Sequence, residues 1–334
     1  MELIIAEFIS SLPTILVLLV IVGSLFTLGK GADLLVDEAV DLATTLNIPK
    51  AIIGATIVSL GTTLPELSVS TLAAINGNPD LALGNAVGSV IVNTSLIIGI
   101  SAMLKPIKLD LESIKVQGWL KIISAIMLIV LSLPLLNKDG IGRVSQYTGF
   151  FFIMVLGVYL YWSLKQNNDN SKDNDLIAKE KVKLSSIIKL VIGMAVVIVS
   201  SRILIPAVEI SAFRIGIPQS IIAATLVAFG TSLPELTTSV KAVLKGHGDL
   251  AVGNVIGADI LNILFVIGVS AAVTNGGLIV PDVFYKLHFP IMSIVLLLFR
   301  YVTLNKGSTI SRREGLLLFV FYILYLGLNV TNII

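Results

Sequence analysis

The sequence contains no cysteine, only two histidines, and few charged residues, 13% of the chain. Without cysteine there is no disulfide, no thiolate metal site and no thiol nucleophile. The chain also lacks the G-x-S-x-G and H-E-x-x-H patterns of hydrolytic enzymes, so enzyme activity is weakly supported and we expect none. A net charge of +2 is too small to favour nucleic acid as a partner.

The chain is instead rich in long apolar runs, and 55% of its residues are hydrophobic. The runs are about twenty residues long, the length that crosses a bilayer. Glu2 and Glu7, with no basic cluster before the first run, argue against a cleaved signal peptide and for a permanent first span. We expect an all-α membrane protein with ten transmembrane helices, at roughly 13–45, 50–76, 80–104, 115–136, 143–165, 183–213, 218–245, 249–274, 280–304 and 311–333.

A polar segment near the middle predicts the domain organisation and the orientation. Residues 166–182 read as a linker between a first half, 1–165, and a second half, 183–334. Basic residues concentrate in the gaps on the linker's side, so the positive-inside rule predicts a cytoplasmic linker and both termini outside, in the plasma membrane. These residues are Lys50, Lys105, Lys108, Lys115, Lys121, Lys165, Lys172, Lys179, Lys181, Lys183, Lys241, Lys245, Lys306, Arg312 and Arg313.

The two halves contain an internal repeat. The segment from Pro49 aligns without a gap to the segment from Pro218, and 25 of the 51 aligned positions are identical. Because each half is expected to hold an odd number of spans, five, the second copy enters the membrane inverted relative to the first. The sequence thus predicts two inverted five-helix repeats, a plan that many secondary transporters share.

Each copy places a polar motif inside its apolar run, "GTTLPELS" in the second span and "GTSLPELT" in the seventh. The proline lacks an N–H and leaves a carbonyl four residues earlier without its helical partner, and the glycine tolerates the opening. Spans 2 and 7 are therefore predicted to be broken helices. Glu66 and Thr62 are four residues apart and share a helix face, as do Glu235 and Thr231.

The span after each motif carries a polar stripe beside a ridge of glycines. Asn85, Ser89 and Asn93 recur every four residues, and Gly84 and Gly88 permit another helix to approach closely. The first asparagine of each stripe could bind an ion or make a hydrogen bond between helices, and both interpretations stay open. In the second copy the stripe is Asn254, Ala258 and Asn262, beside Gly253 and Gly257.

All these candidate ligands are oxygen atoms, which suit Ca²⁺, Mg²⁺ or Na⁺ rather than zinc or copper. Two glutamates supply a charge of −2, which one divalent ion neutralises. An uncompensated buried pair is costly, so we expect the site always to hold cations or protons. One ion then leaves only as another replaces its charge, which favours exchange. A cation channel lined by the same groups is the alternative from another class.

Other carboxylates are expected to have roles other than ion binding. Asp80 and Asp249 stand just ahead of a span and are expected to cap helix N-termini. Asp33, Asp37 and Glu38 lie toward the end of the first span, where interfacial solvation is the favoured interpretation.

The two motifs, each followed by "GNAVGSVIVN" or "GNVIGADILN", resemble the α-1 and α-2 repeats of the sodium/calcium exchangers, here 54–99 and 223–268, in the cation/Ca²⁺ antiporter superfamily. The resemblance is to the prokaryotic type without a large regulatory loop. It implies a Na⁺/Ca²⁺ antiporter working by alternating access, whose first and sixth spans slide against the others. It implies Ca²⁺ bound by Glu66 and Glu235, and further Ca²⁺ or Na⁺ ligands at Thr62, Thr231, Ser59, Ala228, Ser89, Asn93 and Asn262, with Thr63 and Ser232 as adjacent candidates.

Four positions bear on ion selectivity. Ala258 lacks the hydroxyl that Ser89 has, which affects one Na⁺ site. Asn262 is neutral where the potassium-dependent branch has aspartate, which suggests exchange without K⁺. Gly88 and Gly257 stand where proton-coupled relatives place an acidic residue, which weakens the case for Ca²⁺/H⁺ exchange. Ca²⁺/H⁺ exchange and the exchange of Na⁺ for another divalent cation are the alternatives. The expected partners are Ca²⁺, Na⁺ and the bilayer, with no other cofactor and no obligatory protein partner.

Overall fold

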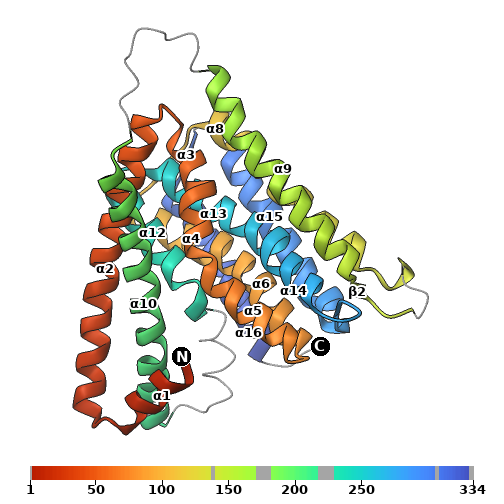
Figure 1. The fold of residues 1–334 in the computed structure, drawn as a ribbon, viewed down its shortest axis with the longest axis horizontal. Helices are drawn as coiled ribbons and strands as arrows, with labels where there is room; N and C mark the ends of the chain where they lie inside the picture. Colours follow the sequence, from red (N-terminus) through yellow and green to blue (C-terminus); the bar gives the residue numbers. More distant parts are fainter. Residues whose placement is uncertain (1, 137–139, 171–181, 217–228, 305–307, 331–334) are drawn as a thin grey trace.

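The computed structural model describes residues 2–136, 140–170, 182–216, 229–304 and 308–330. These residues form helices joined by short loops and four two-residue strands (Figure 1), so the expected all-α class is confirmed. Among them, six helices are long and apolar enough to cross a membrane, or seven if one bent pair counts as a single span. The number of ten spans remains a prediction.

Two long helices, α2 (Thr14–Thr45) and α10 (Leu184–Arg214), pack along each other at one side of the bundle (Figure 1). The sequence did not predict the short helix α1 (Glu2–Ser11) that precedes them. Arg214, at the end of α10, donates hydrogen bonds to the carbonyl oxygens of Ser10 and Leu12. The N-terminal segment is thereby fastened to the end of α10.

The predicted break in the second span is present. Its first part runs through α3 (Lys50–Ile53), the π-helical turn η1 (Gly54–Val58) and α4 (Ser59–Thr62), and α5 (Leu64–Ile75) follows at an angle of 47°. Pro65 lies in the first turn of α5, where a missing N–H needs no partner. In the seventh span, α12 (Leu233–Leu244) likewise starts with Pro234 in its first turn. The earlier part of that span, including Ala228, lies outside the described residues.

The two stripe-bearing helices form the centre of the bundle. Each begins as an α-helix, passes through a π-helical turn near the last asparagine of its stripe, and continues as α-helix. The glycine ridge is confirmed in the second copy, because a Cβ on Gly253 or Gly257 would strike the carbonyl oxygen of Ala51 or Ala55. No described helix approaches closely at Gly84 of the first copy, where a Cβ would meet nothing within 4 Å. The segments are α6 (Pro79–Ile91), η2 (Val92–Ile97) and α7 (Ile98–Leu104), then α13 (Gly248–Leu261), η5 (Asn262–Ile267) and α14 (Gly268–Val273).

The remaining helices surround this centre, and α9 reaches Asn170, so the first residues of the predicted linker are helical. Two antiparallel strand pairs join loops of the two halves: β1 (Ile107–Lys108) with β4 (Thr309–Ile310), and β2 (Arg143–Val144) with β3 (Leu278–Ile279). The surrounding elements are α8 (Leu111–Ser132), η3 (Pro134–Leu136), α9 (Gln146–Asn170), η6 (Phe284–His288), α15 (Phe289–Leu304) and α16 (Arg312–Val330).

The predicted N-cap roles of Asp80 and Asp249 are wrong. Asn78 caps α6, its side chain accepting a hydrogen bond of 3.1 Å from the backbone N–H of Leu81. The Oδ1 atom of Asp249 instead accepts a hydrogen bond of 2.6 Å from the backbone N–H of Asp110, which precedes α8. A short polar side chain near a helix start can serve another segment when that segment brings an N–H closer.

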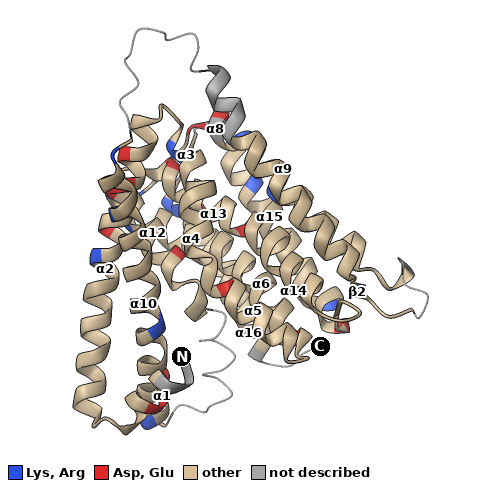
Figure 2. Ribbon diagram, in the orientation of Figure 1, with Lys and Arg blue, Asp and Glu red and all other residues tan. Residues whose placement is uncertain are grey.

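The carboxylates near the end of α2 form ion pairs, and the expected solvation describes the exposed Asp37 but not the buried Glu38. They join α2 to α12 and to α10, and Figure 2 shows charges gathered on the half of α2 that lies beside α12. Glu38 is only 8% exposed. The pairs are Lys241 with Asp33 (3.1 Å), Lys245 with Asp37 (2.7 Å) and Lys189 with Glu38 (3.0 Å).

Candidate cation site

The glutamates of the two motifs meet in the interior of the protein. Glu66 lies in the first turn of α5 and Glu235 in the first turn of α12, and both are 0% exposed. They are close enough for their charges to interact. The positive end of a helix dipole stabilises a carboxylate in its first turn, but two such charges out of water still repel. The pair therefore requires a cation beside it or a bound proton.

Hydroxyl groups cross between the two motifs. The Oγ atom of Ser232 donates a hydrogen bond of 3.4 Å to Oε1 of Glu66 and lies 3.3 Å from Oγ of Ser89. A hydroxyl from one half of the chain thus reaches the glutamate of the other half, a relation that a sequence motif alone cannot show.

Asn85 makes hydrogen bonds through both atoms of its amide. Its Nδ2 atom donates to Oγ of Ser70 at 2.9 Å and to the backbone oxygen of Glu66 at 3.3 Å. Its Oδ1 atom accepts from Oγ1 of Thr231 at 3.0 Å. Of the two interpretations left open, the contacts of Asn85 favour the hydrogen bond between helices.

Asn254 repeats part of this arrangement. Its Nδ2 atom donates to Oγ of Ser239 at 3.4 Å, and its Oδ1 atom has no hydrogen-bond partner within the described residues. Ser239 and Ser70 are equivalent positions of the repeat. The same side-chain contact therefore occurs in both copies, but only the second leaves an amide oxygen available to a ligand.

Several other buried oxygens of the site lack a protein partner in the part of the chain described. Leaving buried polar atoms unsatisfied is costly, so such atoms point to a ligand that they would coordinate. The described residues contain no group of three His, Asp or Glu side chains suited to a metal, so neutral oxygens must complete any coordination shell. The atoms are Oε2 of Glu66, both carboxylate oxygens of Glu235, Oγ1 of Thr63, and the amide oxygens of Asn93 and Asn262.

The remaining predicted residues are placed as follows. Ser59 is buried, and its carbonyl accepts hydrogen bonds from Oγ1 of Thr62 at 3.3 Å and the N–H of Thr63 at 2.9 Å. Ala258 is buried and contributes no polar side-chain atom. A Cβ on Gly61 would strike Sδ of Met194 in α10, so this glycine serves helix packing as well as the break.

A buried ion pair beside the stripes was missed from the sequence. Nζ of Lys121, in α8, lies 2.6 Å from Oδ2 of Asp259, in α13, and the two side chains are 1% and 0% exposed. Placing Lys121 in a cytoplasmic gap was therefore wrong. The signal was available, because opposite charges in two separate apolar runs are expected to pair.

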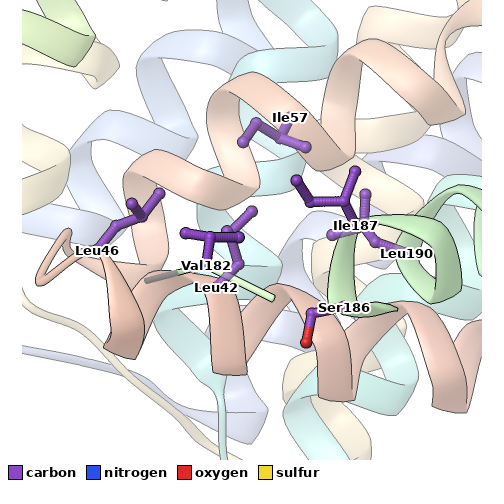
Figure 3. Close-up of a pocket in the computed structure, with 7 residues that line it drawn as sticks. All are labelled: Leu42, Leu46, Ile57, Val182, Ser186, Ile187 and Leu190. Atoms are coloured by element: carbon purple, nitrogen blue, oxygen red, sulfur yellow. The ribbon is translucent and has the colours of Figure 1, made fainter. Parts of the chain in front are cut away.

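A cavity of about 300 Å³ lies elsewhere, between α2, η1 and α10. Figure 3 shows that its walls are almost entirely hydrocarbon, with one hydroxyl. It holds neither glutamate and offers no charge to a cation, so it is separate from the candidate site. The lining residues are Leu42, Leu46, Ile57, Val182, Ser186, Ile187 and Leu190.

A multi-pass helical bundle with a broken segment, and with carboxylates from both halves buried together in its interior, defines the class of membrane cation transporters. The family model described as "Sodium/calcium exchanger protein" matches residues 16–165 and 185–331. The chain belongs to this sodium/calcium exchanger family and is a transporter rather than an enzyme.

Similar proteins cover nearly the whole chain. The putative antiporter CaxA of Alkalimonas amylolytica is 34% identical over 88% of this chain and 92% of its own. The sodium/calcium exchanger MaX1 of Methanosarcina acetivorans is 30% identical, covering 94% and 98%. The inner membrane protein YrbG of Escherichia coli is 32% identical, covering 93% and 95%. A structure of the sodium-calcium exchanger NCX_Mj, soaked with Na⁺ and Sr²⁺, is 28% identical, covers 94% of this chain and 99% of its own, and superposes with a TM-score of 0.80.

Proposed function

We propose that the protein exchanges Na⁺ for Ca²⁺ across the plasma membrane by alternating access. The observation that carries this proposal is the meeting of Glu66 and Glu235, both fully buried. Ser232 of one motif donates a hydrogen bond to Glu66 of the other, and both carboxylate oxygens of Glu235 lack a protein partner within the described residues. Oxygen donors and a charge of −2 suit one Ca²⁺ or a set of Na⁺ ions. The sodium/calcium exchanger MaX1 supports the same assignment by similarity.

Charge compensation couples the two ions. Ca²⁺ neutralises both glutamates, and it can depart only as Na⁺ ions take over its charge, because an uncompensated pair in this interior is too costly. If more than two Na⁺ replace each Ca²⁺, every cycle moves net charge and the rate responds to voltage. The neutral side chain of Asn262 favours exchange that does not require K⁺.

The ligands of this proposal come from both motifs and both stripes. Glu66 and Glu235 bind Ca²⁺, and hydroxyl, amide and backbone oxygens complete the Ca²⁺ and Na⁺ sites. Asn85 serves helix packing, whereas Asn254 has an oxygen available. The other ligands are Thr62, Thr63, Ser89, Asn93, Thr231, Ser232 and Asn262, with the carbonyls of Ser59 and Ala228.

Alternating access follows from ten spans in two inverted repeats, 1–165 and 183–334, around the linker 166–182. Two observations support the repeat: the asparagine–serine contact that occurs in both copies, and strand pairs that join loops of one half to loops of the other. The side-by-side pair of α2 and α10 is the candidate moving unit. Without Lys121, the gaps on the linker's side still contain most of the basic residues, which supports a cytoplasmic linker and outside termini.

The test is Ca²⁺ uptake by proteoliposomes loaded with Na⁺ and diluted into Na⁺-free medium. We expect the outward Na⁺ gradient to drive uptake of radiolabelled Ca²⁺, and Glu66→Gln and Glu235→Gln each to abolish it. Asp80→Asn, which neutralises an exposed carboxylate at the start of α6, is the matched control and should transport normally. Uptake that ignores Na⁺ but follows a pH gradient would reassign the protein to Ca²⁺/H⁺ exchange.

A further inference from the structure

The Lys121–Asp259 pair lies within the transport core, yet neither residue is among the predicted ligands of the cation site. The ammonium of Lys121 lies 2.6 Å from Oδ2 of Asp259 and donates to Oγ1 of Thr94 at 2.8 Å. Oγ1 of Thr94 in turn donates to Oδ2 of Asp259 at 2.6 Å. The face of the Phe299 ring lies 4.2 Å from the same ammonium. Two oxygens and an aromatic face form a closed cradle for one positive charge.

The cradle adjoins the candidate cation site. Thr94 follows Asn93 directly in η2, and Asp259 follows Ala258 in α13. The Asp259 carboxylate is close enough to Glu235 for their charges to interact, and its Oδ1 atom has no hydrogen-bond partner within the described residues. Asp259 therefore adds a third carboxylate to the same buried region, and Lys121 is its counter-charge.

The pair also breaks the internal repeat. Asp259 aligns with Val90 of the first copy, a buried apolar residue, so duplication does not explain this charge. The substitution stands beside Ala258, where the second copy lacks the hydroxyl of Ser89. The second copy has thus lost a neutral oxygen and acquired a carboxylate that is matched by a lysine from α8.

We propose that Lys121 is a tethered cation: its ammonium occupies a monovalent-cation position at Asp259. Because Lys121 neutralises Asp259 permanently, only the charges of Glu66 and Glu235 are left for the transported ions to neutralise. An ammonium and K⁺ are similar in size and charge, and the cradle offers oxygens and a ring face that suit either. Shortening the lysine therefore creates a binding site for a free monovalent cation. The inference deepens the proposed function and rests on it for its transport consequence only.

The experiment compares wild type, Lys121→Ala and Lys121→Ala/Asp259→Asn, purified in detergent. Thermal unfolding is followed while K⁺ or n-propylammonium replaces N-methylglucamine at constant ionic strength. n-Propylammonium matches the atoms that the alanine substitution removes. We expect either cation to raise the unfolding temperature of Lys121→Ala saturably and to leave wild type and the double variant unchanged. Two results would overturn the proposal. In the first, Lys121→Ala unfolds at the wild-type temperature when neither cation is present. In the second, neither K⁺ nor n-propylammonium raises the unfolding temperature of Lys121→Ala.

A transport measurement keeps the proposal falsifiable should Lys121→Ala fail to fold. The double variant lacks both charges, so it should keep the wild-type charge moved per Ca²⁺ in proteoliposomes. A change in that ratio contradicts the tethered-cation role. The unfolding measurement does not depend on transport. A wild type that fails to couple Na⁺ to Ca²⁺ would refute the proposed function, and the unfolding measurement would still test cation binding at Asp259 independently.

Discussion

The Oγ1 atom of Thr231 donates a hydrogen bond of 3.0 Å to Oδ1 of Asn85, joining the motif of one half to the stripe of the other. Asn85 is 2% exposed and is held on its other side by Ser70 and the backbone of Glu66. This bond therefore connects the start of α12 to the helix that carries Glu66. It is a direct link between the two halves at the candidate site.

Removing that hydroxyl should destabilise the protein. In Thr231→Val the Oδ1 atom of Asn85 is left buried without its donor, a change that costs about 1–3 kcal/mol. Thr231→Ser keeps the hydroxyl and should cost much less. The measurement is the unfolding free energy in detergent without Ca²⁺ or Na⁺, so that ion binding does not contribute. Equal stability of the two variants would show that the bond has no such role.

The glycine ridge of α13 should not tolerate a side chain. In Gly257→Ala the added Cβ meets the carbonyl oxygen of Ala55 and Oγ of Ser59, and the backbone has little room to move. Overpacking of this kind costs about 1–3 kcal/mol. Gly157→Ala is the control, since its Cβ meets nothing within 4 Å, and alanine is favoured over glycine in a helix by about 1 kcal/mol. Folded yield and thermal unfolding distinguish the two; a Gly257→Ala protein as stable as wild type would contradict the packing.

The sequence predicted what depends on local pattern. Proline and glycine in "GTTLPELS" predicted the bend between Thr62 and Leu64, and the repeat predicted that Glu66 and Glu235 would have equivalent places. The ridge of Gly253 and Gly257 was predicted because close helix packing requires small residues.

What the sequence did not predict depends on which elements become neighbours. Lys121 and Asp259 stand far apart in the chain, and only the packing of α8 on α13 pairs them. The contact of Asp249 with Asp110 has the same cause. The hydroxyl of Ser232 reaches Glu66 because two motifs face each other, a relation that neither motif contains.

The ion pairs between α2 and α12 should hold α2 against the core. Lys241→Met/Lys245→Met removes both partners of Asp33 and the partner of Asp37, which are partly exposed, so each pair contributes no more than about 1 kcal/mol. We expect faster hydrogen exchange in the second half of α2, measured by mass spectrometry. Lys189→Met removes the ion pair between α10 and α2 and leaves those to α12 in place. It tests whether the faster exchange arises from losing the contact with α12 in particular. The same acceleration in Lys189→Met would contradict that assignment.

His247 should make stability depend on pH. Burial, and then the adjacent Lys50, whose Nζ lies 3.2 Å from Nδ1, lower the pKa of His247 below its usual 6.5. The folded protein thus binds this proton less readily than the unfolded chain. Its contribution is fully present above about pH 6.5 and is lost as pH falls from there toward the lower folded-state pKa.

The measurement is the unfolding temperature of wild type minus that of His247→Gln between pH 5 and pH 7.5. We expect this difference to fall as the solution becomes more acidic. Lys50→Met should weaken the fall, because it removes one cause of the lowered pKa. A difference that stays constant with pH, or that grows in acid, would refute the assignment.

The central claim is that Glu66 and Glu235 together bind the Ca²⁺ that Na⁺ displaces. Anomalous diffraction from crystals soaked in Ca²⁺, with and without high Na⁺, tests it most directly. We predict a Ca²⁺ peak between the two carboxylates that disappears in high Na⁺ and is absent from Glu235→Gln crystals. A Ca²⁺ peak located away from both glutamates, or one between them that Na⁺ does not displace, would contradict the account.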